Sequence, residues 1–195
     1  MRQQDVSRTQ LLDAAEEVFG RKGFHETTLK EVAELAEFSV GSVYSFFENK
    51  DDLFLHVFLR RGDEFLPGME AAATAGDDAV AQLHALVDFE VGFFRQHPHF
   101  GRLYLRSVPG ELLDSSPQLA DNFARAMEVQ AGIFRRGQAA GTLRDGDPSV
   151  LARLLSGLVA SYQSTDPAVV ADPPSTDERL PLSALHEVVD GAFRR

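Results

Sequence analysis

Residues 28–50 contain several residues that can cap helices and several hydroxyl side chains that can bind phosphate. Thr28 and Glu31 have the spacing of a capping box, which predicts the start of a short helix. Ser39 can cap a second short helix after a tight connection. Two short helices joined in this way form a helix-turn-helix, whose second helix fits the DNA major groove while hydroxyls and helix N-termini hold phosphates. The same pattern also occurs in helical proteins that bind no nucleic acid.

The elements around this pair are also predicted to be helices, because apolar residues recur at helical spacing nearly throughout the chain. Ser7 and Gln10 have capping-box spacing and predict a first helix from near Arg8, which Gly23 ends. Asn49 caps a fourth helix. The expected helices span about 8–23, 29–36, 40–47, 50–65, 78–96, 98–109, 117–141, 148–164 and 182–193.

Proline marks several expected boundaries in the second half of the chain. Pro67-Gly68 predicts a disturbance after the fourth helix, and Pro98 and Pro109 bracket a short one. Residues 165–181 hold many Pro, Asp, Ser and Thr residues and predict an exposed loop. No alternating strand pattern or internal repeat is present, so the fold class is all-α.

The composition bears on the possible function classes. The chain has no cysteine, which excludes disulfides, thiolate metal sites and a cysteine nucleophile. The N-terminal residues are polar and no stretch is apolar enough to span a membrane, so we expect a cytoplasmic protein without membrane contact. The net charge is −11, and acidic residues outnumber basic ones even before Arg61. A DNA-binding domain of this composition must place its few cations well, because phosphate attraction supplies much of the affinity.

A series of motifs runs without a gap through the N-terminal part of the chain. It consists of Leu11-Leu12-Asp13-Ala14-Ala15, Phe19, Lys22-Gly23-Phe24, Thr27-Thr28, Val32-Ala33, Ala36, Phe38-Ser39, Gly41-Ser42-Val43-Tyr44, Phe47, Asn49-Lys50 and Leu53-Phe54. In this series the sequence from Arg8 to about Phe58 resembles the DNA-binding domain of TetR-type transcriptional regulators. The resemblance implies a helix-turn-helix DNA-binding domain over residues 1–50 and an effector-binding and dimerisation domain over 51–195. It implies a repressor that binds a palindromic double-stranded DNA operator as a homodimer and is released by a small-molecule effector.

The resemblance also implies a role for each matching residue of the helix-turn-helix. Thr27, Thr28, Tyr44 and Lys50 would contact phosphate, Thr28 would also cap its helix, and Ser39 belongs to the same expected DNA-binding set. The base-facing positions would be Val40, Gly41, Ser42 and Ser45, with Phe46 on the groove wall.

The sequence departs from the family pattern at two positions. Glu37 stands where the family usually has glycine, and a left-handed turn residue with a side chain is strained. Val40 stands where the family often has a basic or polar residue. The recognition helix therefore lacks Arg, Asn and Gln, and we expect modest direct base readout, with part of the specificity from DNA shape.

In the family the last two long helices pair with their twofold mates, and here these are about 148–164 and 182–193. The expected dimer interface comprises Leu151, Leu154, Leu155, Leu158, Tyr162, Leu185, Val188 and Val189. The alternative is that these apolar faces pack only inside one subunit.

The family's effector pocket lies among the middle helices, which are rich in aromatic residues here. The expected lining is Phe58, Phe65, Phe89, Phe93, Tyr104, Phe123, Met127, Gln130 and Tyr162. Such a lining favours a flat or apolar ligand, although core packing is the alternative for each residue. His97 and His99 have no obvious third ligand nearby, and Pro98 between them breaks helical spacing. We therefore expect no metal and no cofactor.

Two other functions are compatible with parts of this pattern. A small-molecule carrier or interaction protein with a degenerate helix-turn-helix would show no salt-sensitive DNA binding, and the acidic N-terminal domain favours it. An enzyme would turn over a bound ligand. The sequence shows no nucleophile–base set, recognisable carboxylate pair or cofactor loop, so we expect no catalytic residues.

Overall fold

The computed structural model describes residues 3–107, 116–175 and 177–195, and these residues form helices without an extended strand. Pro109, an expected helix end, lies outside them. The helices are α1 (Gln3–Lys22), α2 (Leu29–Leu35), α3 (Val40–Tyr44), α4 (Lys50–Ala72), α5 (Ala79–Gln96), α6 (Pro98–Arg106), α8 (Pro117–Ala139), α9 (Pro148–Gln163), α10 (Pro167–Val170) and α11 (Leu182–Phe193). The predicted all-α fold is confirmed.

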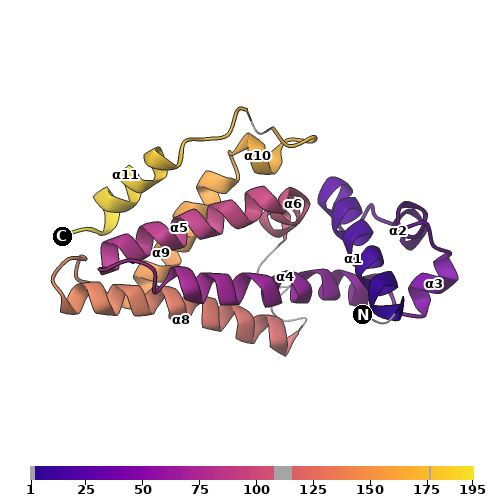
Figure 1. The fold of residues 1–195 in the computed structure, drawn as a ribbon, viewed down its shortest axis with the longest axis horizontal. Coiled ribbons are helices and arrows are strands. Elements are labelled where there is room, and N and C mark those ends of the chain that lie inside the picture. The colour runs from indigo at the N-terminus through magenta and orange to yellow at the C-terminus, as the bar shows by residue number, and fades with distance from the viewer. Residues whose placement is uncertain (1–2, 108–115, 176) are drawn as a thin grey trace.

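The molecule is elongated, with α1, α2 and α3 gathered at one end (Figure 1). α4 leads away from this end with α5 and α8 packed against it, and α9 packs on α8 and α5. α6 packs against α1, and α11 lies with the C-terminus at the end opposite α3. Two of the helices beside α1, namely α4 and α6, therefore belong to the large helical part of the molecule.

Local capping signals set several helix boundaries near the N-terminus. Thr28 and Glu31 form the reciprocal capping box that opens α2. The Asn49 side chain accepts a hydrogen bond from the backbone N–H of Asp52 at 2.9 Å and opens α4. Gly23 ends α1 in the left-handed region, with φ 82°.

Two predicted boundaries in this region are wrong. α1 begins before the expected Arg8, and its first turn includes Asp5, whose charge favours a helix N-terminus. α3 ends before the expected Phe47. The chain leaves this helix through a tighter turn, in which the N–H of Phe46 donates to the carbonyl of Val43 at 3.0 Å.

The predicted disturbance at Pro67-Gly68 is also wrong, because α4 continues through it. Leu66 and Met69 are buried on either side of Pro67. Their packing offsets the loss of a helical hydrogen bond, a loss that costs about 3 kcal/mol. Gly68 makes room for Phe89, since a Cβ at that position would lie 2.3 Å from Cε2 of Phe89.

The segment 165–181, expected to be an exposed loop, contains α10 and buried residues. Asp166 is fully buried and caps α10. Its carboxylate accepts hydrogen bonds from Nε of Arg95 at 2.7 Å and from the N–H of Leu180 at 3.2 Å. A four-residue helix is too short to show a periodicity, so composition alone misassigned this segment.

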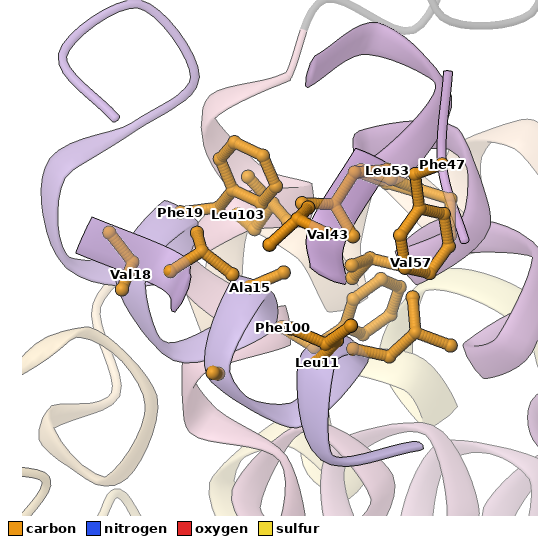
Figure 2. Close-up of a cluster of buried hydrophobic side chains, with 14 of the residues drawn as sticks. Leu11, Ala15, Val18, Phe19, Val43, Phe47, Leu53, Val57, Phe100 and Leu103 are labelled. Atoms are coloured by element: carbon orange, nitrogen blue, oxygen red, sulfur yellow. The ribbon is translucent and has the colours of Figure 1, made fainter. Parts of the chain in front are cut away.

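The core is continuous between the helix-turn-helix and the rest of the molecule. Figure 2 shows Phe19 of α1, Val43 of α3 and Leu103 of α6 in one cluster of buried side chains. α4 contributes to the same cluster. The expected boundary between 1–50 and 51–195 thus falls at the start of a helix that both parts share, and that division stays a prediction.

Candidate nucleic-acid interface and ligand cavity

The helix expected to read DNA, α3, lies at the tip of the molecule (Figure 1). The Ser39 hydroxyl caps it by accepting a hydrogen bond from the N–H of Ser42 at 3.1 Å. Val43 is buried, while Gly41 is exposed and Tyr44 is 58% exposed. A five-residue helix therefore presents small groups and one tyrosine to solvent.

The other residues expected to contact DNA differ in exposure. Thr28 and Ser45 are exposed. Thr27 is 1% exposed, and its hydroxyl donates to the carbonyl of Gly23 at 2.7 Å. The Thr27 hydroxyl thus helps to hold the turn after α1, and the expected phosphate contact of this residue stays a prediction. The half-buried members of the set are Val40, Ser42, Phe46 and Lys50.

The Lys50 ammonium is occupied inside the domain. Nζ donates to the carbonyl oxygens of Phe24 at 2.9 Å, Thr27 at 3.1 Å and His25 at 3.4 Å. It also lies 4.4 Å from the centroid of the Phe24 ring. These contacts use all three donors of an ammonium group. Lys50 therefore holds the loop before α2, and its expected phosphate contact stays a prediction.

The turn between α2 and α3 contains a strained residue. Glu37 has φ 62°, in the left-handed region that costs a residue with a side chain roughly 1–2 kcal/mol. The following N–H, of Phe38, donates to the carbonyl of Ala33 at 2.8 Å and closes the end of α2. The backbone at this position has the conformation that favours glycine, but the residue is an exposed glutamate.

Acidic partners neutralise two cations near the candidate interface. Lys22 pairs with Glu31, and Lys30 pairs with Glu34 at 3.6 Å. The hydrogen bond from Lys22, supported by the backbone and hydroxyl of Thr28, lowers the pKa of Glu31 to about 2. These two cations are therefore partly screened by neighbouring acids.

A cavity of about 160 Å³ lies among α4, α5, α6, α8 and α9. Its wall is mainly aromatic and aliphatic, and the polar groups on it are few. Of the residues expected to line an effector pocket, the structure brings together Phe58, Phe65, Tyr104, Phe123, Met127 and Gln130.

The other three expected lining residues lie outside this cavity. Phe89 and Phe93 pack against Phe65, with ring centroids 5.4 and 5.1 Å apart. The hydroxyl of Tyr162 donates to the carbonyl of Leu180 at 2.6 Å and accepts from Arg95 at 3.1 Å. These three side chains therefore make contacts between elements and do not line the cavity. Helical periodicity in the sequence cannot distinguish the two roles.

The cavity wall contains one acid, Glu90, which the sequence analysis did not single out. Glu90 is 7% exposed, and Nε2 of Gln130 donates to its Oε1 at 3.2 Å. Gln130 in turn accepts from the hydroxyl of Ser156 at 3.0 Å. Burial raises the pKa of Glu90 to about 8, and burial together with Glu90 raises the pKa of Tyr104. The sequence does carry a signal for this residue, since Glu90 is an acid among the apolar residues of α5.

Known proteins are similar to this chain in fold and in sequence. The chain is 24% identical over 156 residues to the fatty acid metabolism regulator protein of Bacillus subtilis, covering 78% of this chain and 79% of that protein. It superposes on the fatty acid degradation regulator FadR of Bacillus halodurans with a TM-score of 0.79, 17% identity and 95% coverage of both chains. FadR of Bacillus subtilis in complex with stearoyl-CoA gives a TM-score of 0.74 and 22% identity, covering 93% of this chain and 94% of that one.

The sequence profile of the bacterial regulatory proteins of the tetR family matches residues 11–57, which form most of α1, all of α2 and α3, and the start of α4. The chain belongs to the TetR family. It is a transcriptional regulator with an N-terminal helix-turn-helix and a C-terminal helical domain.

In this TetR-family regulator two cavity-lining helices also hold α1. Arg61 of α4 donates to the carboxylate of Glu16 at 2.7 and 3.1 Å, and Glu16 is 5% exposed. Arg102 of α6 is 3% exposed and donates to the carbonyl of Gly20 at 3.2 Å, as Arg106 also does. Sequence reasoning missed these links because they join residues far apart in the chain.

The expected dimer interface of this TetR-family regulator is partly in the subunit core. Leu154 and Val188 are exposed, by 58% and 52%, and Val150, which the sequence analysis did not include, is 50% exposed. Leu158 and Tyr162 are half-buried. The remaining four face inward because α9 and α11 use their main apolar faces to pack on α8 and α5. These buried residues are Leu151, Leu155, Leu185 and Val189.

Neither histidine near Pro98 belongs to a metal-binding cluster. His99 accepts a hydrogen bond from Arg102 at 2.7 Å, and His97 lies 3.9 Å from a carboxylate oxygen of Glu64. In the described part of this TetR-family chain, no three potential metal ligands gather, and no helix is long and apolar enough to cross a membrane.

Proposed function

We propose that this regulator is a homodimeric repressor that acts in the cytoplasm on a palindromic DNA operator and is released by a small apolar ligand. Each protomer would place α3 in a major groove, and the two grooves would lie about one helical turn apart. The function proposed here includes no catalytic step, metal or cofactor.

The exposure of a capped α3 at the tip of the molecule carries this proposal (Figure 1). Tyr44 offers its hydroxyl group on the exposed surface of α3, and Gly41 permits close approach to the DNA. Hydroxyls at a helix edge suit phosphate contacts, which position the helix without reading the base sequence. Because neighbouring cations are paired with acids, we expect weak non-specific binding.

Exposed apolar side chains on α9 and α11 support the dimer. Val150 and Leu154 are four residues apart on α9, and Val188 is exposed on α11. Family resemblance implies that these two helices meet their twofold mates as a four-helix bundle. A twofold dimer matches the symmetry of a palindromic operator.

The cavity supports the proposal that a ligand controls DNA binding, because two helices that line it, α4 and α6, also bond to α1. Phe100 and Tyr104 of α6 line the cavity, and Arg102 of the same helix bonds to Gly20 of α1. Arg61 of α4 both lines the cavity and pairs with α1. A ligand that shifts α4 or α6 would move the helix-turn-helix, and such coupling is typically about 1–3 kcal/mol. The relatives concerned with fatty acids make an acyl chain one candidate for the apolar part of the ligand.

The test is a fluorescence-anisotropy titration of the full chain with the intergenic DNA upstream of its own gene, at two salt concentrations. Tyr44→Phe removes one hydroxyl from each protomer and should weaken binding at least tenfold, since a hydrogen bond to a charged group contributes about 1.5–3 kcal/mol. Val170→Ala, at an exposed site on α10, is the matched control and should leave affinity unchanged. Lys50→Ala is unsuitable, since it would remove the contacts that hold the loop before α2.

Binding no tighter than to random DNA, or unchanged binding by Tyr44→Phe, would contradict the proposed interface. A protein that binds ligands in the cavity and ignores DNA at both salt concentrations would be a carrier with a degenerate helix-turn-helix.

A further inference from the structure

Among the described residues Glu90 has no cationic partner, and it lies on the wall of a cavity that is mainly apolar. Glu90 is only 7% exposed. Its carboxyl group accepts a hydrogen bond from the neutral amide of Gln130. Arg61 is the cation on the cavity wall, and it is already paired with Glu16 and Glu64. A buried acid in such surroundings costs free energy that an apolar residue of similar size would not.

Aromatic rings line the same cavity as Glu90. Phe94 lies 5.8 Å from Phe100 and 5.3 Å from Tyr104, measured between ring centroids, and all three line the cavity with Glu90. The faces of aromatic rings attract cations, most strongly where water is excluded. A cavity that contains both an acid and several aromatic rings can bind an apolar molecule that carries a positive charge.

We propose that the cavity binds an amphiphilic cation, an ammonium group attached to an apolar chain or ring system, with the ammonium against Glu90. This inference rests on the proposed function, because it names the chemical class of the ligand that the cavity takes. The charge of the protein agrees with it: a net charge of −11 attracts cations and repels anionic ligands. An anionic head group would also need a free cation on the wall, and Arg61 is engaged.

Binding of such a cation displaces one proton. With the cavity empty, burial raises the pKa of Glu90 to about 8, so the carboxyl group is protonated at pH 7. The incoming ammonium favours the carboxylate, the O–H bond breaks, and the proton passes to the buffer. Charge in the cavity stays balanced, since one carboxylate forms for each cation bound. About 0.9 proton should be released per ligand at pH 7.

The other groups that face Glu90 do not compete for this proton. Tyr104 of α6 has a pKa raised by burial and stays neutral at pH 7. Arg61 of α4 keeps its charge and its carboxylate partners. The walls contributed by α8 and α9 present the neutral groups of Gln130, Ser156 and Gln163.

The experiment is isothermal titration calorimetry of the full chain at pH 7 in two buffers of different ionisation enthalpy. Three ligands share one ten-carbon chain: decyltrimethylammonium, decanol and decanoate. We expect the cation to bind at least tenfold more tightly than the other two, with release of close to one proton. Glu90→Gln should weaken cation binding at least tenfold and abolish proton release, while changing decanol binding less than threefold. Glu187→Gln, an exposed acid on α11, should behave like the unaltered protein.

Equal or tighter binding of decanol or decanoate, proton release that persists in Glu90→Gln, or no binding of the cation would overturn the inference. The anisotropy assay judges operator binding separately. A protein that binds its operator and prefers decanoate would thus lose this inference and keep the proposed function. A protein that binds the cation with proton release and binds no operator would keep the site and lose the regulatory role.

Discussion

Glu37 occupies a backbone conformation, φ 62°, that glycine adopts at little cost. Glu37→Gly should raise the free energy of unfolding by about 1 kcal/mol, because the left-handed conformation no longer strains a side chain. It should also tighten operator binding, since it removes a negative charge beside α3. Thermal unfolding and anisotropy measure the two effects.

Glu37→Gln separates the two effects at this position. It removes the charge and retains the strained side chain, so it should tighten DNA binding without stabilising the fold. Equal stability of the glycine and glutamine variants would show that the turn relaxes around the side chain.

The buried acid Glu90 makes stability depend on pH. Its pKa rises from an ordinary 4.5 to about 8 in the folded protein, so the folded state binds the proton more tightly than the unfolded state. This contribution is fully present below pH 4.5 and is lost as pH rises towards 8. Glu90→Gln should therefore unfold at a higher temperature than the unaltered protein at pH 8, with the difference shrinking towards pH 4.5. Parallel pH profiles for Glu90→Gln and the unaltered protein would contradict the raised pKa.

The contact between α1 and α6 depends on the absence of a side chain at Gly20. A Cβ there would lie 2.4 Å from the carbonyl oxygen of His99, a backbone atom that cannot rotate away. Gly20→Ala should therefore separate the two helices and lower the free energy of unfolding by roughly 1–3 kcal/mol. Gly92→Ala is the matched control, since nothing lies within 4 Å of its added Cβ. That substitution should be neutral or stabilise α5 by up to about 1 kcal/mol.

Thermal unfolding of the two alanine variants measures this difference, and operator binding tests its consequence. If α6 couples the cavity to the helix-turn-helix, Gly20→Ala should also reduce the effect of a saturating ligand on DNA affinity. Similar unfolding temperatures for Gly20→Ala and Gly92→Ala would show that the helices separate without cost.

Elements with local signals could be predicted from the sequence, and elements that depend on tertiary packing could not. The capping box of Thr28 involves residues three apart, so its spacing is visible in the chain. The continuation of α4 through Pro67 depends on the burial of Leu66 and Met69 by other helices. α10 is stabilised by contacts to its buried cap from Arg95, which is distant in the sequence.

The same distinction applies to the candidate sites. The start of α3 could be predicted because its Ser39 cap is a local signal. The engagement of Lys50 with backbone carbonyls and the isolation of Glu90 arise from distant segments meeting in space. Apolar periodicity indicated that α9 and α11 carry many apolar residues. It did not indicate which of these residues pack in the subunit core and which remain exposed.

At the scale of the whole molecule, operator binding by a twofold dimer depends on the exposed residues of α9 and α11. Leu154→Arg would place a charge in the proposed interface, close to its own copy across a twofold axis. Removing apolar contact and adding like charges should convert the dimer to a monomer in sedimentation velocity. Leu154 is 58% exposed, so the subunit should remain folded by circular dichroism.

Operator affinity should fall with the dimer, because a monomer engages one half-site and loses the gain from simultaneous binding. Val170→Arg is the control, since it adds the same charge at an exposed apolar site on α10. It should leave the dimer and operator affinity intact. A Leu154→Arg variant that sediments as a dimer would place the interface elsewhere on the molecule. A monomer that retained full operator affinity would instead show that one helix-turn-helix suffices, and would contradict the proposed palindromic operator.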